Sequence, residues 1–102
     1  MKRLRVRFAE TADADFKDIL LFLRRQNVSA RIATGFVRSI RDRCRRIGDA
    51  PNGGRPRDDL RPGLRTVPFE GRTLIAYLVA DDHVVITNVF YGGRDFEALM
   101  RD

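Results

Sequence analysis

Residues 54–65 read GRPRDDLRPGLR, and this loop separates a helix-like half of the chain from a strand-like half. The loop cannot be helical, because Pro56 and Pro62 each fix their own φ and push the preceding residue out of the helical region. Gly63 suits the turn that follows Pro62. The loop therefore carries four guanidinium groups on a stiff backbone into the strand that follows it, which is expected to begin at Leu64. Such an arrangement suits an anionic or carboxylate-bearing partner.

The half before the loop is predicted to form one strand and two helices. Residues 4–8 alternate apolar and Arg positions, the pattern of a strand with one buried face. Thr11 is expected to cap a helix that runs to about Arg25, and Ser29 to cap a second helix. Residues 26–28 make a short connection, so the two helices are predicted to form an antiparallel hairpin. The second helix is expected to bury one face, made of Ile32, Phe36, Val37, Ile40, Cys44 and Ile47.

The half after the loop is predicted to form a three-stranded meander. Its strands are residues 64–69, with Pro68 at an edge or bulge, residues 74–79, apolar on both faces, and residues 84–91. The element order is β-α-α-β-β-β in a single domain, residues 1–102. This order predicts an α+β fold in which an N-terminal strand and a helical hairpin pack on an antiparallel sheet.

The first helix has more apolar surface than its own core face requires. Ala12, Phe16, Ile19, Leu20 and Leu23 fall on one arc, whereas Leu21 and Phe22 lie outside it. A partner that covers Leu21 and Phe22 is one explanation. The alternative is that the chain's own tail covers them, and apolar side chains are available there at Phe96, Leu99 and Met100.

The formal charge of +6 is unevenly distributed, with +4 in residues 1–7, +4 in residues 41–72 and −3 in residues 73–102. Clustered cations favour a partner with phosphates or acidic side chains. Composition bias toward Arg over Lys, as a GC-rich genome produces, explains the residue type equally well. No apolar stretch follows the basic N-terminus and none approaches transmembrane length, so we expect a cytoplasmic protein.

Most catalytic and cofactor signatures are missing from the sequence. It has one Cys, one His and no phosphate-binding glycine motif, so we expect neither a metal nor a cofactor. Cys44 is expected to be a buried hydrophobe, and His83 a solvated turn residue beside Asp81 and Asp82.

Several motifs together resemble the ParE branch of the RelE/ParE toxin family. They are the GRPR and LRPGLR segments of the loop, Tyr77, the Asp81-Asp82 turn, and the closing Val89-Phe90-Tyr91-Gly92-Gly93-Arg94-Asp95. An N-terminal strand and a helical hairpin that holds Ala12 and Asp15-Phe16 complete the pattern. The resemblance covers nearly the whole chain. It implies the toxin of a type II toxin–antitoxin pair, with no cofactor, that inhibits DNA gyrase, blocks replication and is neutralised by a ParD-like antitoxin.

Two other functions stay open. RelE-like relatives cleave messenger RNA on the ribosome, and such a site would draw on Tyr91 or His83 to move a proton. The sequence has only two lysines, neither in the strand-rich half, which favours a gyrase poison over a nuclease. A basic nucleic-acid-binding module without toxicity is the third possibility.

The residues expected to contact the target or a nucleic acid are Arg65, Arg72 and Arg94. For Arg65 and Arg72 the alternative role is an ion pair with Asp58, Asp59 or Glu70, and for Tyr91 it is packing at a strand end. Arg55, Arg57 and Arg61 are expected to do no more than pair with Asp58 and Asp59.

Overall fold

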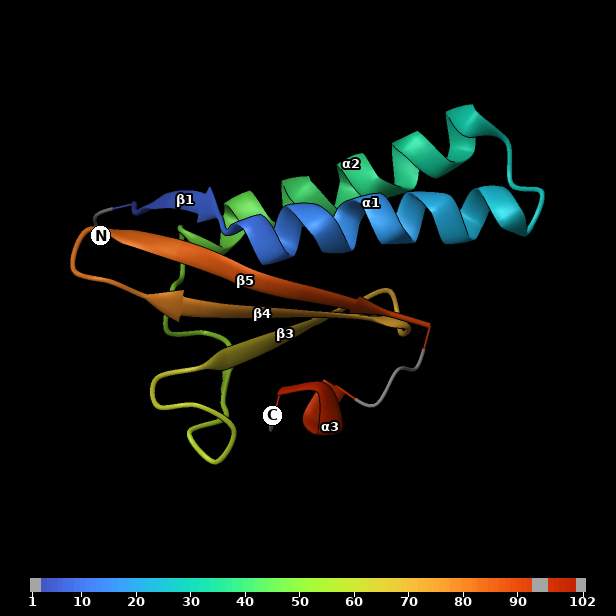
Figure 1. Cartoon of the computed structure of the whole chain (residues 1–102). Coiled ribbons are helices and arrows are strands. Elements are labelled where there is room, and N and C mark those ends of the chain that lie inside the picture. Colours follow the sequence, from blue (N-terminus) through green and yellow to red (C-terminus); the bar gives the residue numbers. More distant parts are fainter. Residues whose placement is uncertain (1–2, 93–95, 101–102) are drawn as a thin grey trace.

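The computed structural model describes residues 3–92 and 96–100, in which a helical hairpin covers one face of a five-stranded sheet (Figure 1). A short C-terminal helix lies on the opposite face. The predicted α+β fold is confirmed. In chain order the elements are β1 (Arg5–Phe8), α1 (Glu10–Arg25), α2 (Ala30–Ile47), β2 (Arg55–Pro56), β3 (Arg65–Phe69), β4 (Thr73–Val79), β5 (His83–Tyr91) and α3 (Phe96–Met100).

The sheet has the strand order β1-β5-β4-β3-β2 and is mixed. Strands β3, β4 and β5 form the predicted antiparallel meander. Strand β1 joins its edge in parallel with β5, with Arg5 opposite His83 and Phe8 opposite Ile86. The hairpin and the rest of the chain lie between β1 and β5, which gives the long crossover that parallel neighbours require. A two-residue strand, β2, pairs with β3 and was not predicted, because Pro56 argues against a strand.

Helix α1 begins differently from the prediction. Its N-cap is Ala9, with no side-chain capping bond, so the expected capping role of Thr11 is wrong. The Thr11 hydroxyl instead donates to the backbone carbonyl of Thr87 in β5. Thr11 makes this contact because a backbone carbonyl at the unpaired edge of β5 needs a hydrogen-bond donor.

Helix α2 has the predicted cap, because the hydroxyl of Ser29 accepts a hydrogen bond from the backbone N–H of Ile32 at 3.2 Å. Its core face contains Ile40 and Cys44 as expected. Ile32, however, is 65% exposed, so its predicted place in the core is wrong. At 100° per residue Ile32 lies about 80° around the helix from Ile40, which takes it off the buried arc.

Apolar side chains fill both faces of the sheet. On the helix side, Ile75, Tyr77 and Ile86 pack beneath Phe16 and Ile40 in the main core. On the other side a smaller cluster of Leu64, Ala76 and Phe90 packs against Leu60, Leu74, Leu78 and Met100. Strand β4 is therefore covered on both faces, as predicted. Within residues 3–92 and 96–100, no helix combines the length and apolarity that crossing a bilayer would require.

Candidate functional site

Arg65 lies at the start of β3 and is tied to the loop that precedes β2. Its Nη1 donates to the carbonyl oxygens of Asn52, at 2.9 Å, and Gly54, at 2.8 Å. Tyr77, opposite Arg65 in β4, donates its hydroxyl to the carbonyl of Pro51 and accepts from the N–H of Gly54. Arg65 and Tyr77 thus hold residues 51–54 by their backbone. The carboxylate pairing considered for Arg65 is replaced by these carbonyl contacts in the described residues.

The approach of Tyr77 to the loop explains one glycine. A Cβ placed on Gly54 would lie 2.4 Å from the Tyr77 hydroxyl oxygen. Burial of Tyr77 raises the pKa of its phenol above the usual value. Tyr77 was noted in the sequence as part of the family resemblance. In the structure its side chain has a structural role, because the loop at residues 51–54 packs against it and is hydrogen-bonded to it.

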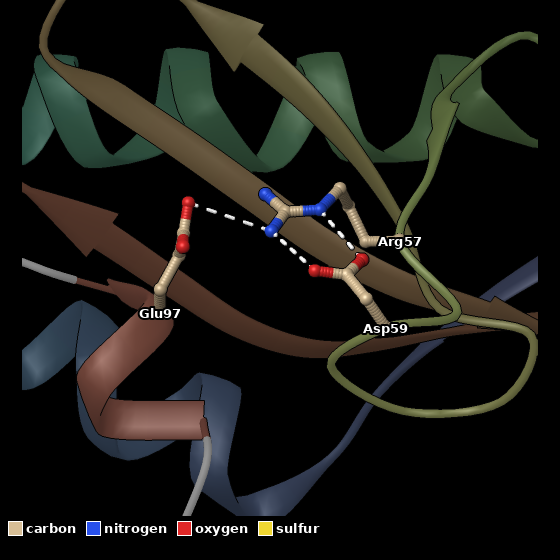
Figure 2. A network of polar contacts seen from close by, with 3 residues as sticks. All are labelled: Arg57, Asp59 and Glu97. Carbon is tan, nitrogen blue, oxygen red and sulfur yellow. Dashed lines mark hydrogen bonds and ion pairs between the residues drawn. The ribbon is translucent and has the colours of Figure 1, made fainter.

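Arg57 joins the arginine loop to the C-terminal helix (Figure 2). Its Nε and Nη2 contact the two carboxylate oxygens of Asp59 at 3.0 and 2.8 Å, and Nη2 also lies 3.4 Å from Oε1 of Glu97 in α3. The hydrogen bonds to Asp59, with Glu97 nearby, raise the pKa of Arg57. The predicted pairing of Arg57 is confirmed, whereas Asp58 accepts a hydrogen bond from the N–H of Gly63 at 2.8 Å. Arg55 and Arg61 are exposed.

Arg72 lies at the other end of β3, in the turn before β4, with its side chain exposed. Its carbonyl accepts a hydrogen bond from Gly92, and the next residue, Thr73, pairs with Tyr91. The structure therefore brings Arg72 and Tyr91 to one end of the sheet and leaves Arg65 at the other. Arg94, the third predicted contact residue, lies outside the described residues.

His83 begins β5, at the end opposite to Tyr91. Its Nδ1 lies 2.7 Å from Oδ1 of Asp82, and this contact lowers the pKa of the Asp82 carboxyl. His83, Asp81, Asp82 and four residues of the N-terminal segment, Arg3, Leu4, Arg5 and Arg7, line a hollow of about 540 Å³. Eight residues of extended strand place His83 about 26 Å from Tyr91. The two proton-moving candidates therefore cannot act on one phosphate.

Tyr91 packs on the helix side of the sheet. Its ring centroid lies 5.9 Å from that of Phe22 and 5.4 Å from that of Phe36, both in edge-on geometry. Such packing at a strand end was the alternative role considered for Tyr91, and the structure confirms it. Beside this contact, a hollow of about 310 Å³ is lined by Asp18, Ile19, Phe22, Tyr91 and Gly92.

Leu21 and Phe22 remain 52% and 45% exposed, as the sequence predicted. The described tail does not cover them. Helix α3 lies on the far face of the sheet, where Met100 packs with the Leu64 cluster, and Leu99 is 47% exposed. Ile32, which sequence reasoning placed in the core, adds a third exposed apolar side chain to the hairpin.

Cys44 is fully buried in α2, and burial raises the pKa of its thiol to about 12. The thiol is therefore held protonated at neutral pH, which fits the predicted role as a buried hydrophobe. In the part of the chain that the structure describes, no three His, Cys, Asp or Glu side chains are grouped so as to hold a metal ion.

Sequence reasoning missed the contacts that two polar residues of α1 make with β5. Asp15 Oδ2 accepts from the N–H of Val89 at 2.8 Å, and Thr11 donates to Thr87 as described above. Their partners lie more than 70 residues away, so no local pattern marks these contacts.

Comparison with known proteins identifies relatives of the whole domain. Residues 6–96 match the family model described as the ParE toxin of the type II toxin–antitoxin system parDE. No curated protein matches at a significant level.

Several solved structures share the fold. One is the chromosomal ParDE system from P. aeruginosa, with a TM-score of 0.74 at 19% identity, covering 87% of this chain and 96% of the other. A second is the RelBE2 toxin–antitoxin complex from Mycobacterium tuberculosis, with a TM-score of 0.57 at 24% identity, covering 92% and 97%. A third is the YoeB–YefM complex from Staphylococcus aureus, with a TM-score of 0.52 at 20% identity, covering 89% and 99%.

Proposed function

The chain belongs to the ParE toxin family of type II toxin–antitoxin systems, and from this premise we propose that it poisons DNA gyrase and is neutralised by a ParD-like antitoxin. The fold alone does not choose between gyrase and the ribosome, since relatives with the RelBE and YoeB–YefM names share it. The choice rests on the chemistry of the side chains.

The separation of His83 and Tyr91 favours a poison that binds its target over one that cleaves RNA. RNA cleavage without a metal needs an acid or base close to cations that stabilise the phosphorane. Here His83 and Tyr91 lie at opposite ends of β5, His83 contacts Asp82, and the Tyr91 ring packs against Phe36. Arg65 is engaged by loop carbonyls. The described residues therefore support binding to a target better than catalysis.

The antitoxin proposal rests on the exposed apolar side chains of α1. Leu21 and Phe22 are uncovered, and the 310 Å³ hollow beside Phe22 is lined by Ile19 and the Tyr91 ring. A hollow of this kind suits an apolar side chain of a docked segment, and the net charge of +6 favours an acidic one. The three structural relatives are described as toxin–antitoxin systems or complexes, which is consistent with such a partner.

A supercoiling assay with purified gyrase tests the target. Added toxin is expected to stop supercoiling and to accumulate cleaved DNA bound to the enzyme. The rival activity, cleavage of messenger RNA on the ribosome, is tested in cells that express the toxin. Primer extension on translated messages after induction detects such cuts. Discrete cuts in those messages, with gyrase unaffected, would replace this proposal with the ribosome-dependent nuclease.

The antitoxin surface is tested with Phe22→Asp, which introduces a charge beside the hollow. Co-purification with the product of a neighbouring acidic reading frame is expected to be lost, while growth arrest persists. The matched control is Ile32→Asp, an equally drastic change at an exposed residue that does not line the hollow. Retained co-purification by the Phe22 variant would contradict the assignment.

A further inference from the structure

The outward face of α2 carries a straight row of three exposed arginines, Arg31, Arg38 and Arg45. Residues seven apart differ by only about 20° around an α-helix, so the row runs nearly parallel to its axis with steps of about 10.5 Å. The buried residues Ala33 and Ile40 lie on the other side of the helix. The row therefore points away from the core.

This face is open. A Cβ added at Gly35, which lies between Arg31 and Arg38, would meet nothing within 4 Å. Across residues 3–92 and 96–100, neither Arg31 nor Arg38 forms an ion pair, whereas Arg45 pairs with Asp42 at 3.0 Å. Arg41, on the flank of the helix, is different.

The guanidinium of Arg41 is used inside the fold. It lies 4.3 Å from the centroid of the Phe16 ring and 5.1 Å from that of Phe8, and Nη2 is 3.5 Å from Oδ1 of Asp13. Arg41 thus stabilises the packing of the helix, whereas Arg31 and Arg38 in the row do not. Packing therefore gives no reason for Arg31 and Arg38.

Helix α2 carries the largest net charge of the described helices and strands. Residues 30–47 contain six arginines and one aspartate, a charge of +5, in a chain of net charge +6. Helix α1 beside it has four acidic and three basic residues. The strongest positive field of the described surface is thus expected over α2 and not over the arginine loop, where Asp58 and Asp59 offset part of the charge and Asp59 pairs with Arg57.

We propose that the α2 arginine row binds the phosphodiester backbone of duplex DNA without regard to base sequence. Duplex DNA carries about one phosphate for every 1.7 Å of its axis, counting both strands, so its surface offers closely spaced anions to a row of guanidinium groups. Guanidinium groups contact phosphate oxygens through paired N–H donors. This inference rests on the proposed function in one respect, because a gyrase poison works where DNA is held.

An acidic protein segment is a poorer fit to the same row. Amphipathic segments dock by placing apolar side chains in pockets. The residues between these arginines on the outward face are Thr34, Gly35 and Asp42, none of which is large and apolar. An apolar hollow lies on another part of the described surface, beside Phe22.

Fluorescence anisotropy of a short labelled duplex of mixed sequence, titrated with the full chain in the absence of gyrase, tests the proposal. The double variant Arg31→Gln/Arg38→Gln is expected to bind between about tenfold and a hundredfold more weakly, from the loss of charge-assisted hydrogen bonds. The slope of log affinity against log salt should fall in magnitude by about 2, because two phosphate contacts are lost.

Three controls make the result decisive. Arg5→Gln/Arg7→Gln removes the same charge from exposed positions in β1 and should change the affinity much less. Arg31→Lys/Arg38→Lys keeps the charge and should retain most of the salt slope. Thermal melts should show that all three double variants fold.

Equal losses in the β1 and α2 variants would overturn the proposal by showing a diffuse charge effect. Competition by polyglutamate as efficient as that by unlabelled duplex would overturn it in favour of an acidic protein partner. Because gyrase is absent from the titration, weak DNA binding with intact gyrase poisoning removes only this inference. Tight, row-dependent binding without gyrase poisoning removes only the proposed function.

Discussion

The carboxylate of Asp15 in α1 accepts a hydrogen bond at 2.8 Å from the backbone N–H of Val89 in β5. Strand β1 covers this edge of β5 only as far as Ile86, where Phe8 is the last paired residue. Beyond that point α1 takes over the edge, with Thr11 bonded to the carbonyl of Thr87 and Asp15 to Val89. The first helix is thus both the cover of the sheet and a continuation of its pairing.

Asp15→Ala should therefore destabilise the fold by about 1–3 kcal/mol, the usual cost of an unsatisfied buried backbone donor. Asp15→Asn keeps an acceptor oxygen for Val89 and should lose less. Urea denaturation monitored by circular dichroism measures both. Asp18→Ala, an exposed acid in the same helix, is the control, and an equal loss there would contradict the special role of Asp15.

Two glycines are predicted to respond oppositely to alanine. At Gly54 a methyl group would meet the Tyr77 hydroxyl, and the overpacked loop should cost about 1–3 kcal/mol. At Gly35, in the middle of α2, the new methyl group finds open space, and the gain in helix propensity should be about 0.5–1 kcal/mol. Shifts of the urea midpoint in the same direction for both variants would be inconsistent with the described packing.

The sequence predicted the local elements of this fold but not the contacts between distant segments. Periodicity located the hairpin and the meander, and the residue type at Ser29 located the cap of the second helix. All three depend on residues that are close in the sequence. It could not identify the parallel partner of β1, since alternation marks a buried face and not a neighbour.

The candidate site was predicted less completely than the fold. Leu21 and Phe22 are exposed as expected, because helical periodicity shows which side chains leave the core arc. Arg65 was assigned to a target, but its Nη1 is bound by Asn52 and Gly54. Carbonyl oxygens carry no signal in the side-chain sequence, so only the folded loop reveals them.

Tyr77 should make stability fall at alkaline pH. Its folded-state pKa is raised by burial, so the folded chain holds the phenolic proton more tightly than the unfolded chain does. This stabilisation is complete below the unfolded pKa of about 10 and is lost as the pH rises through the raised pKa. Denaturation at a series of pH values should show the loss in the parent chain.

Tyr77→Phe is the matched variant for this measurement. It removes two hydrogen bonds, to Pro51 and from Gly54, and with them the titrating group. Its stability should be lower at neutral pH and should decline less between neutral and alkaline pH. Because the chain has no tryptophan, absorbance of tyrosinate should also show a late titration that disappears in the variant.

Arg65 and Arg72 should separate stability from toxicity. Arg65→Ala removes two hydrogen bonds from a charged donor to the loop and should cost about 1–2 kcal/mol, because the site is partly exposed.

Arg72→Ala, at an exposed turn, should change stability by less than about 0.5 kcal/mol and yet weaken growth arrest if Arg72 meets the target. Thermal melts and growth curves after induction measure the two effects, with Arg55→Ala as the control for loss of an exposed arginine. Full toxicity in the Arg72 variant would remove that residue from the target surface, and an unchanged melting temperature in the Arg65 variant would contradict its role in holding residues 51–54.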